Sequence, residues 1–223
     1  MISTTALERD DSLRDKALRI LRQAIVSGEI QAGELYSATA LARRLQVSVS
    51  PVREAMLTLV NAGIMEPVRN RGFRVAELGE SDLDEIFELR VLLEVPAVQA
   101  LAATDLSGER ERLEELVRAT EESARDGDVT RFLATDREFH LALIEQHGNG
   151  RLTDWVANLR DQTRLYGLKD SHSHPLVEAA AEHRAILEAI LEGEGEQVGQ
   201  LLTSHLSHIR NEWASGPGQD VPE

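Results

Sequence analysis

The segment from Ser37 to Val75 constrains the fold of this chain more than any other part. It contains two short helical patterns separated by a tight turn, followed by a pattern typical of a β-hairpin. In the first pattern Leu41 and Leu45 repeat at i, i+4, which predicts a short helix with one buried side. We expect Ser37 to cap this helix, because a serine side chain can accept a hydrogen bond from the first turn. The order of elements predicts a winged helix-turn-helix.

The second helical pattern has one apolar face and a charged residue away from it. We expect Ser50 to cap this helix and Pro51 to occupy its first helical position. Arg53 points away from the apolar face, and Gly63 ends the helix. The apolar face consists of Val52, Ala55, Met56 and Leu59 at i, i+3, i+4 and i+7.

Met65 to Val75 is predicted to form a hairpin that turns at Asn70-Arg71-Gly72. Arg69 and Arg74 flank this turn, so its tip is basic. An outward Arg53 beside a basic hairpin has the layout needed to enter a major groove and contact phosphates. Arg53 could equally be an ordinary surface arginine, and the module could bind a protein. The basic hairpin favours DNA.

The charge of the chain is divided unevenly along its length. The net charge is −15, but residues 1–78 carry 11 basic and nine acidic residues, whereas residues 79–223 carry 13 and 30. The acidic part would repel DNA and leaves the N-terminal part as the docking surface. A length of 223 residues leaves room for two domains, each with its own core.

Composition also limits the cellular context. The chain has no cysteine, which excludes disulfides, thiolate metal sites and cysteine nucleophiles. Met1 to Asp11 lacks the basic and apolar regions of a signal peptide, and there is no run of 18 apolar residues. We therefore expect a cytoplasmic protein with no membrane partner.

We expect a mainly α fold with four regions. These are a disordered N-terminus (1–10), a winged helix-turn-helix domain (11–78), a helical domain for metal binding, effector binding and dimerisation (79–214), and a disordered tail (215–223).

A helix ending near Ser27-Gly28 precedes the helix-turn-helix, and Ala76 to Glu80 connects the domains. Pro96 should kink or break the first helix of an antiparallel six-helix bundle. The six predicted helices are Ser81 to Ala103, Ser107 to Asp126, Val129 to Gln146, Arg151 to Tyr166, Leu176 to Glu192 and Glu194 to Ala214.

Four polar residues interrupt the apolar stripes of this bundle. Asp136 and His140 lie four residues apart and leave a helix on the same face, while His183 and His205 lie on two later stripes. Any one of these histidines alone is more often a core or surface residue than a ligand. Burying all four separately would carry a desolvation cost, which convergence on one divalent cation would remove. The sequence therefore predicts a metal site.

The N-terminal part resembles the DNA-binding domain of GntR-family transcription regulators over about residues 10–78. The resemblance is carried by the run from Val47 to Met56, then Leu59, Gly63 and the run from Asn70 to Val75. Thr39 and Val49 stand where many members have arginine. We therefore expect an operator that differs from the commoner family sites and an apolar contact from Val49 to a thymine methyl. The candidate DNA-binding residues are Thr39, Ser48, Val49, Ser50, Arg53, Asn70, Arg71 and Gly72.

The C-terminal part resembles the FadR-type C-terminal effector domain, called FCD. This resemblance is carried by the run Glu88 to Glu94, by Asp136-x3-His140, and by His183 and His205. The predicted number of helices, six, is closer to the VanR-like branch. Matching residues in metal-binding members hold zinc, nickel or another divalent ion, and we expect zinc, with nickel or manganese as alternatives. In those members a small organic acid can complete the coordination shell of the metal. Arg90 matches an arginine that can meet the effector carboxylate, although it could instead pair with Glu94 at i+4.

These observations predict a homodimeric DNA-binding regulator, not an enzyme. We expect it to bind a palindromic operator and to respond to a small carboxylate. A metal-dependent hydrolase with an appended interaction domain is the alternative, with Glu138 or Glu145 as base. Both glutamates lie off the Asp136–His140 face, which counts against it. A purely structural metal is a third possibility.

Overall fold

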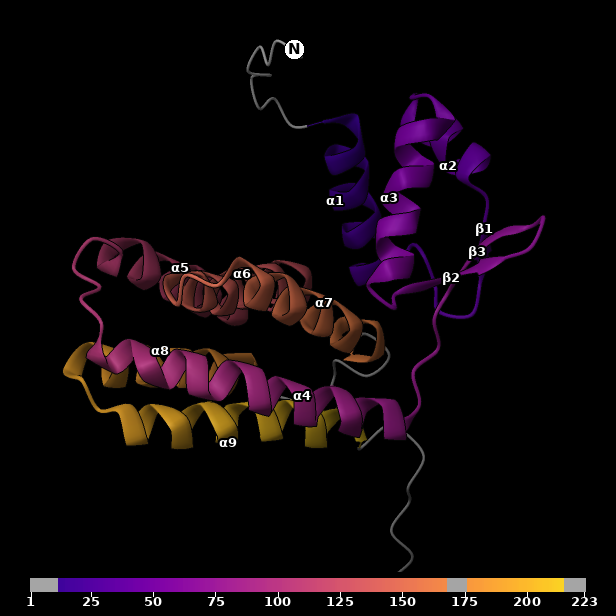
Figure 1. Cartoon of the computed structure of the whole chain (residues 1–223). Coiled ribbons are helices and arrows are strands. Elements are labelled where there is room, and N and C mark those ends of the chain that lie inside the picture. Colours follow the sequence, from indigo (N-terminus) through magenta and orange to yellow (C-terminus); the bar gives the residue numbers. More distant parts are fainter. Residues whose placement is uncertain (1–11, 168–175, 215–223) are drawn as a thin grey trace, which may run out of the picture. The chain divides into compact units, whose positions relative to one another are not determined.

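A computed structural model describes residues 12–167 and 176–214 of the chain. The chain divides into two compact units, an N-terminal unit of residues 1–77 and a C-terminal unit of residues 78–223 (Figure 1). The predicted boundary, after residue 78, lies one residue away. The two ends predicted to be disordered, residues 1–10 and 215–223, lie outside the described residues.

The N-terminal unit packs three helices beside a small sheet. Helices α1 and α3 lie side by side, and the three strands pair antiparallel in the order β1-β3-β2 (Figure 1). Strand β1 was not predicted, because two residues are too short to show the alternation that marks a strand. The elements are α1 (Leu13–Val26), β1 (Leu35–Tyr36), α2 (Ala38–Leu45), α3 (Val49–Asn61), β2 (Met65–Val68) and β3 (Gly72–Val75).

The prediction that Ser50 caps α3 was wrong. The helix begins at Val49 with Ser48 as its N-cap, so Pro51 is the third helical residue and not the first. Proline is tolerated there because the first four N–H groups of a helix have no partner within it. The Ser50 hydroxyl instead donates to Glu54 Oε1 at 3.1 Å.

The start of α2 agrees with the prediction in position but not in its hydrogen bond. Ser37 is the N-cap residue, and its carbonyl accepts a hydrogen bond from the N–H of Leu41. Its side chain makes no capping hydrogen bond within the part of the chain that the structure describes. The helix is therefore held by its buried residues Ala38, Leu41 and Ala42.

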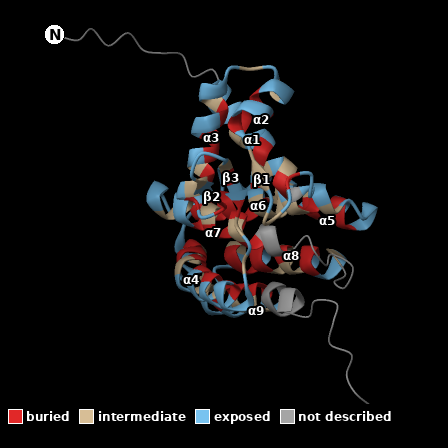
Figure 2. Cartoon of the chain, turned by 90° about the vertical axis from the view of Figure 1, so that its right-hand side faces the viewer, coloured by how far each residue is buried: buried red, intermediate tan, exposed pale blue. Residues whose placement is uncertain are grey.

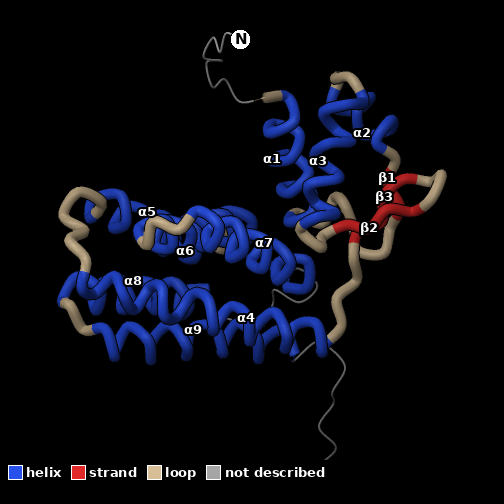
Figure 3. Tube along the Cα trace, viewed as in Figure 1, coloured by secondary structure: helices blue, strands red, loops and turns tan. Residues whose placement is uncertain are grey.

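The C-terminal unit is all-helical over its described residues, and the predicted mainly α fold is confirmed. Helices α5, α6 and α7 form one layer, and α4, α8 and α9 form the other (Figure 1). Figure 3 shows that the strands are confined to the N-terminal unit. The helices are α4 (Glu80–Gln99), α5 (Arg110–Asp126), α6 (Val129–Gln146), α7 (Gly150–Gly167), α8 (Leu176–Glu192) and α9 (Gly195–Ala214).

Helix α4 differs from its predicted form at both ends. It begins at Glu80, one residue early, because Asp82 accepts a hydrogen bond from the N–H of Gly79 at 2.8 Å. It does not break at Pro96 but continues to Gln99 and then tightens into a 3₁₀ turn at Ala100–Ala103. Buried residues on both sides of the proline hold the helix against its neighbours.

The core of the C-terminal unit contains both apolar and charged side chains. Figure 2 shows buried residues along the helices, with exposed residues on the other faces. Large side chains such as Phe139, Leu143 and Ile186 are fully buried. Ten polar residues of the described part are buried among them, including Arg90, Glu94, His140, Arg160, His183 and His205. Because burial of charge is costly without a partner, these groups are expected to interact with one another.

Candidate functional site

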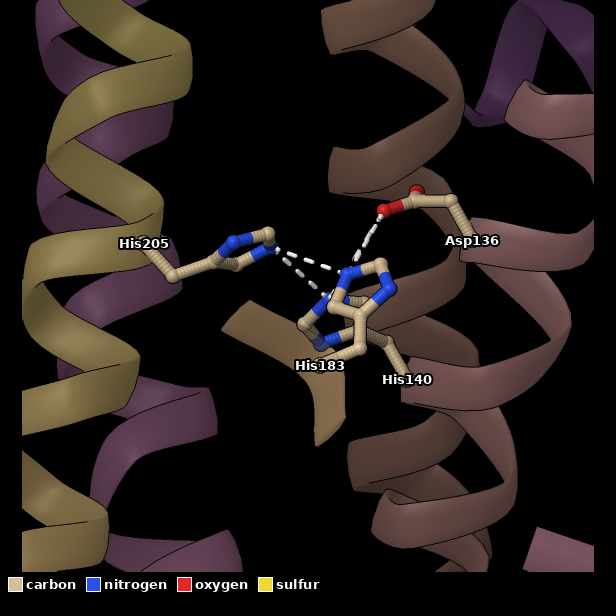
Figure 4. Close-up of side chains that lie close together, drawn as sticks. All are labelled: Asp136, His140, His183 and His205. Carbon is tan, nitrogen blue, oxygen red and sulfur yellow. Dashed lines mark hydrogen bonds and ion pairs between the residues drawn. The ribbon is translucent and has the colours of Figure 1, made fainter. Parts of the chain in front are cut away.

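Asp136 and three histidines from three helices meet in the core of the C-terminal unit (Figure 4). Helix α6 contributes Asp136 and His140, α8 contributes His183 and α9 contributes His205. The Nε2 atom of His140 lies 3.2 Å from that of His183 and 3.1 Å from that of His205, and the third separation is 3.2 Å. Asp136 Oδ1 lies 3.3 Å from His183 Nε2. The structure thus brings together all four predicted metal ligands.

Three ring nitrogens in a triangle cannot all satisfy one another. A hydrogen bond between two of them needs a proton on one and a lone pair on the other. With three nitrogens, at least one contact must set two lone pairs or two protons against each other. A cation that accepts all three lone pairs removes this conflict.

The ionisation states also suit a metal ion. Burial lowers the pKa of His140 well below its ordinary value, and the charge of Arg160 lowers it further. Burial likewise lowers the pKa of His205 to about 4. Both rings are therefore neutral at neutral pH and can offer a lone pair. Imidazole nitrogens about 2.1 Å from one ion lie roughly 3.0–3.4 Å apart in tetrahedral or octahedral geometry, so the residues fit a divalent transition metal.

The carboxylate of Asp136 is kept ionised by its neighbours. Burial raises its pKa, but a hydrogen bond from His183 and the charge of Arg160 outweigh this and hold the pKa well below the ordinary value. Arg160 Nη1 donates to Asp136 Oδ2 at 3.3 Å. The other oxygen, Oδ1, faces the histidines. Asp136 can therefore serve as an anionic ligand.

Glu94 links two arginines beside this cluster. It is fully buried and accepts from Arg90 Nε at 2.7 Å and from Arg160 Nη2 at 2.6 Å. Burial raises the pKa of Glu94, but the charges of Arg160 and Arg90 lower it below the ordinary value. The i, i+4 pair considered for Arg90 is therefore present. Arg90 Nη2 is nevertheless buried with no hydrogen-bond partner among the described residues.

Glu182 of α8 contacts the cluster from its other side. Its Oε2 lies 2.7 Å from His205 Nδ1, and its Oε1 lies 2.7 Å from His208 Nδ1. Burial raises its pKa, but the hydrogen bonds and charges of these two histidines lower it to about 2. Glu182 is therefore ionised at neutral pH.

Sequence analysis missed Arg160 and Glu182 as parts of the site. Arg160 carries a detectable signal, because it follows Val156 and Leu159 and precedes Thr163 on a buried stripe of α7. A charged residue on an apolar stripe is the same signal that identified the histidines. Glu182 is partly exposed and gives no such signal.

The N-terminal unit carries a hollow of about 460 Å³ between its second and third helices and the hairpin. Arg53 lies in its lining and is exposed, as predicted. Its lining includes five of the eight candidate DNA-binding residues: Thr39, Arg53, Asn70, Arg71 and Gly72. The other three, Ser48, Val49 and Ser50, are exposed at the start of α3 and are not part of this lining.

Gly72 has a structural role whether or not it lies near DNA. Its φ is +134°, in a region that favours glycine, and a Cβ there would collide with the carbonyl oxygen of Tyr36. Tyr36 belongs to β1, which pairs with β3. The close approach of these two strands therefore requires glycine at the turn end of the hairpin, where Gly72 pairs with Val68.

Comparisons with known proteins agree with this architecture. The family model "Bacterial regulatory proteins, gntR family" matches residues 13–75, and the FCD domain model matches residues 85–208. The HTH-type transcriptional regulator YdhC of Bacillus subtilis is 28% identical over 84% of this chain and 85% of its own length. The "Probable D-xylose utilization operon transcriptional repressor" of Paenarthrobacter nicotinovorans is 31% identical over 82% of this chain and 80% of its own.

Solved structures show the same fold. Escherichia coli McbR/YncC superposes with a TM-score of 0.82 at 23% identity, covering 92% of this chain and 98% of that one. A GntR regulator from Rhodococcus sp. RHA1 gives 0.76 at 26% identity, covering 90% and 97%. None of the described helices combines the length and apolar character that a membrane span needs. The chain belongs to the gntR family of bacterial regulatory proteins and is a DNA-binding transcription regulator with a C-terminal FCD domain.

Proposed function

We propose that this regulator binds its operator as a homodimer and that a small carboxylate, held beside a divalent metal in the C-terminal unit, changes its operator affinity. The triangle of three buried Nε2 atoms, 3.1–3.2 Å apart, carries this proposal. Zinc is the ion we favour, with nickel or manganese as alternatives. The six α-helices described in the C-terminal unit support a place in the VanR-like branch. We also propose that the protein acts in the cytoplasm.

The metal ligands in this proposal are His140, His183 and His205 through Nε2, and Asp136 through Oδ1. A bound ion would supply a Lewis-acidic position at which a carboxylate oxygen can bind. Three imidazole nitrogens and an anionic aspartate match the preferences of divalent transition metals.

Arg90 supports a carboxylate as the effector. Its Nη2 is buried without a hydrogen-bond partner among the described residues, and such a donor costs about 1–3 kcal/mol. Guanidinium groups bind carboxylates strongly, because two parallel N–H groups match two oxygens. A small organic anion would satisfy the donor that Glu94 leaves unpaired.

A chain of ion pairs connects the cluster to α4. Asp136 of α6 pairs with Arg160 of α7, and Arg160 pairs with Glu94 of α4. Helix α4 begins at Glu80, immediately after the connection to the N-terminal unit. An anion that competes for either arginine would change the contacts that hold α4. Operator affinity then changes only to the extent that the anion prefers one arrangement of the protein.

Dimerisation follows from the task of reading DNA with one short helix per chain. A single recognition helix buries little surface, whereas two of them about one DNA turn apart add their contributions. We therefore propose a palindromic operator. Thr39, Ser48, Val49, Ser50, Arg53, Asn70, Arg71 and Gly72 are the residues proposed to lie at the DNA.

Two measurements on the purified full chain test this proposal. Elemental analysis should find about one divalent ion per chain, and gel shifts on the chain's own upstream DNA should weaken when a metabolite acid is added. His140→Ala should lose the ion. A protein that holds no ion after supply of zinc, nickel and manganese would overturn the metal site. If no acid that binds the protein changes its operator affinity, the proposed effector role is wrong and the metal is structural.

The alternative of a hydrolase is not supported by the positions of its two candidate bases. Glu138 is exposed, and Glu145 is exposed and pairs with Arg112 at 3.3 Å. Neither is among the groups that converge with the histidines. Neither Glu138 nor Glu145 is therefore placed to act as a base on a water bound to the metal.

A further inference from the structure

We propose that Glu182 is a positioning residue that orients His205 for metal binding, with His208 holding Glu182 in place. The ligand concerned is a divalent transition-metal ion. This inference rests on the proposed metal site and adds to it the carboxylate that prepares one of its ligands.

The geometry of Glu182 determines which nitrogen of His205 carries the proton. An ionised carboxylate can only accept hydrogen bonds, so the 2.7 Å contact requires a proton on His205 Nδ1. With Nδ1 engaged by the carboxylate, Nε2 is the ring nitrogen left to bind a metal ion. That atom is the one that faces His140 and His183 (Figure 4). The ring is therefore in the tautomer that a metal needs.

The other two histidines lack such a partner among the described residues. The Nδ1 atoms of His140 and His183 are buried without a hydrogen bond, and Glu94 Oε2 lies 3.6 Å from His140 Nδ1. Among the described residues, His205 is thus the ring whose Nδ1 is held by a carboxylate before the ion arrives. A carboxylate bonded to the far nitrogen also strengthens an imidazole as a metal donor.

His208 completes the arrangement on α9. It lies one turn after His205, and its Nδ1 contacts Glu182 Oε1 at 2.7 Å. The two histidines therefore engage both oxygens of one carboxylate, which restricts its rotation. The side chain of Glu182 is 27% exposed and that of His208 is 50% exposed, whereas His205 is fully buried. We therefore expect substitutions at Glu182 and His208 to disturb the packed core less than substitutions at His205.

Metal affinity of the full chain tests this assignment. Glu182→Gln keeps the shape but removes the charge, and we expect about 10- to 100-fold weaker zinc binding in a chelator competition. Glu178→Gln is the matched control, because Glu178 is exposed one turn earlier on α8 and should leave zinc affinity unchanged. His208→Ala should weaken binding in the same direction but less. Equal zinc affinity of E182Q and E178Q would overturn the assignment.

A second measurement needs no bound metal, and its main result comes from the wild type. Nitrogen NMR of the metal-free wild type should show His205 protonated at Nδ1, and this signal should change in E182Q but not in E178Q. A proton on Nε2 in the wild type would overturn the assignment even if E182Q fails to fold. If the wild type binds no ion, the proposed metal site itself is wrong. If the wild type binds zinc and E182Q binds it equally well, only the proposed role of Glu182 is wrong.

Discussion

The two units place their candidate functional side chains in opposite environments. In the N-terminal unit, Arg53, Asn70 and Arg71 are exposed around an apolar core that does not depend on them. In the C-terminal unit, His140, Arg160 and their partners are themselves part of the core. Substitution of these candidate DNA-binding residues should therefore cost the first unit little stability. The second cannot change its site without changing what holds it together.

The largest expected effect is at Glu94, which neutralises two buried arginines. Glu94→Gln removes the carboxylate partner of buried Arg90 and leaves buried Arg160 with Asp136 alone, which should cost about 3–5 kcal/mol of unfolding free energy in the C-terminal unit. Urea unfolding followed by tryptophan fluorescence measures this, because both tryptophans, Trp155 and Trp213, belong to that unit.

Glu88→Gln provides the control for this change, since Glu88 is exposed on the same helix. We expect its unfolding free energy to differ from that of the wild type by less than about 0.5 kcal/mol. If E94Q were as stable as E88Q, the contrast between a site inside the core and a site on the surface would fail.

Metal removal should also reveal the dependence of the C-terminal unit on its site. At an ion concentration about 1,000 times the dissociation constant, binding adds about 4 kcal/mol to stability, so a chelator should lower the melting temperature. His140→Ala should abolish this response to chelator. His147→Ala should keep it, because His147 is exposed at the end of the same helix. A chelator response in H140A would mean that the ion binds elsewhere.

The N-terminal unit should behave in the opposite way. Arg53→Ala should weaken operator binding by about 1–3 kcal/mol while leaving the melting temperature and metal content unchanged. Arg118→Ala removes an equal charge from an exposed position on α5 and should have a smaller effect. Fluorescence anisotropy at fixed salt compares the two. Equal losses would show that Arg53 contributes only net charge.

The smallest expected effect concerns Val49, which is 38% exposed at the start of α3. Val49→Arg should move the preference at one operator position from thymine toward guanine, with a modest change in total affinity. Selection from a randomised operator library measures this preference. An unchanged preference would remove the proposed apolar contact with DNA.

Local patterns predicted most elements of both units, but not their ends. The apolar face of α3 was evident because it repeats every three to four residues, whereas its first residue was misplaced by two. A serine and a proline can each occupy several positions in a first turn, so the chain's local chemistry does not choose between Ser48 and Ser50 as the cap. Strand β1 exists only because β3 pairs with it.

The candidate metal ligands were predictable for the same reason as the helices. His140, His183 and His205 each interrupt an apolar stripe, and that interruption is visible along a single helix. Arg160 also lies on a buried stripe, but its partners, like the role of Glu182, depend on which helices are neighbours. Glu182 reaches from α8 to α9, and Arg160 reaches from α7 to both α4 and α6.

The sequence alone therefore determined the two-part architecture, the recognition helix and the four residues that converge in the core, since each is encoded by periodicity and local chemistry. Only the tertiary structure decided how those residues are partnered: Glu94 between two arginines, Asp136 against Arg160, and His205 against Glu182. Hydrogen bonds and ion pairs depend on distances of about 3 Å between helices. A periodic pattern specifies which face of a helix is buried, but not which side chain of another helix it meets.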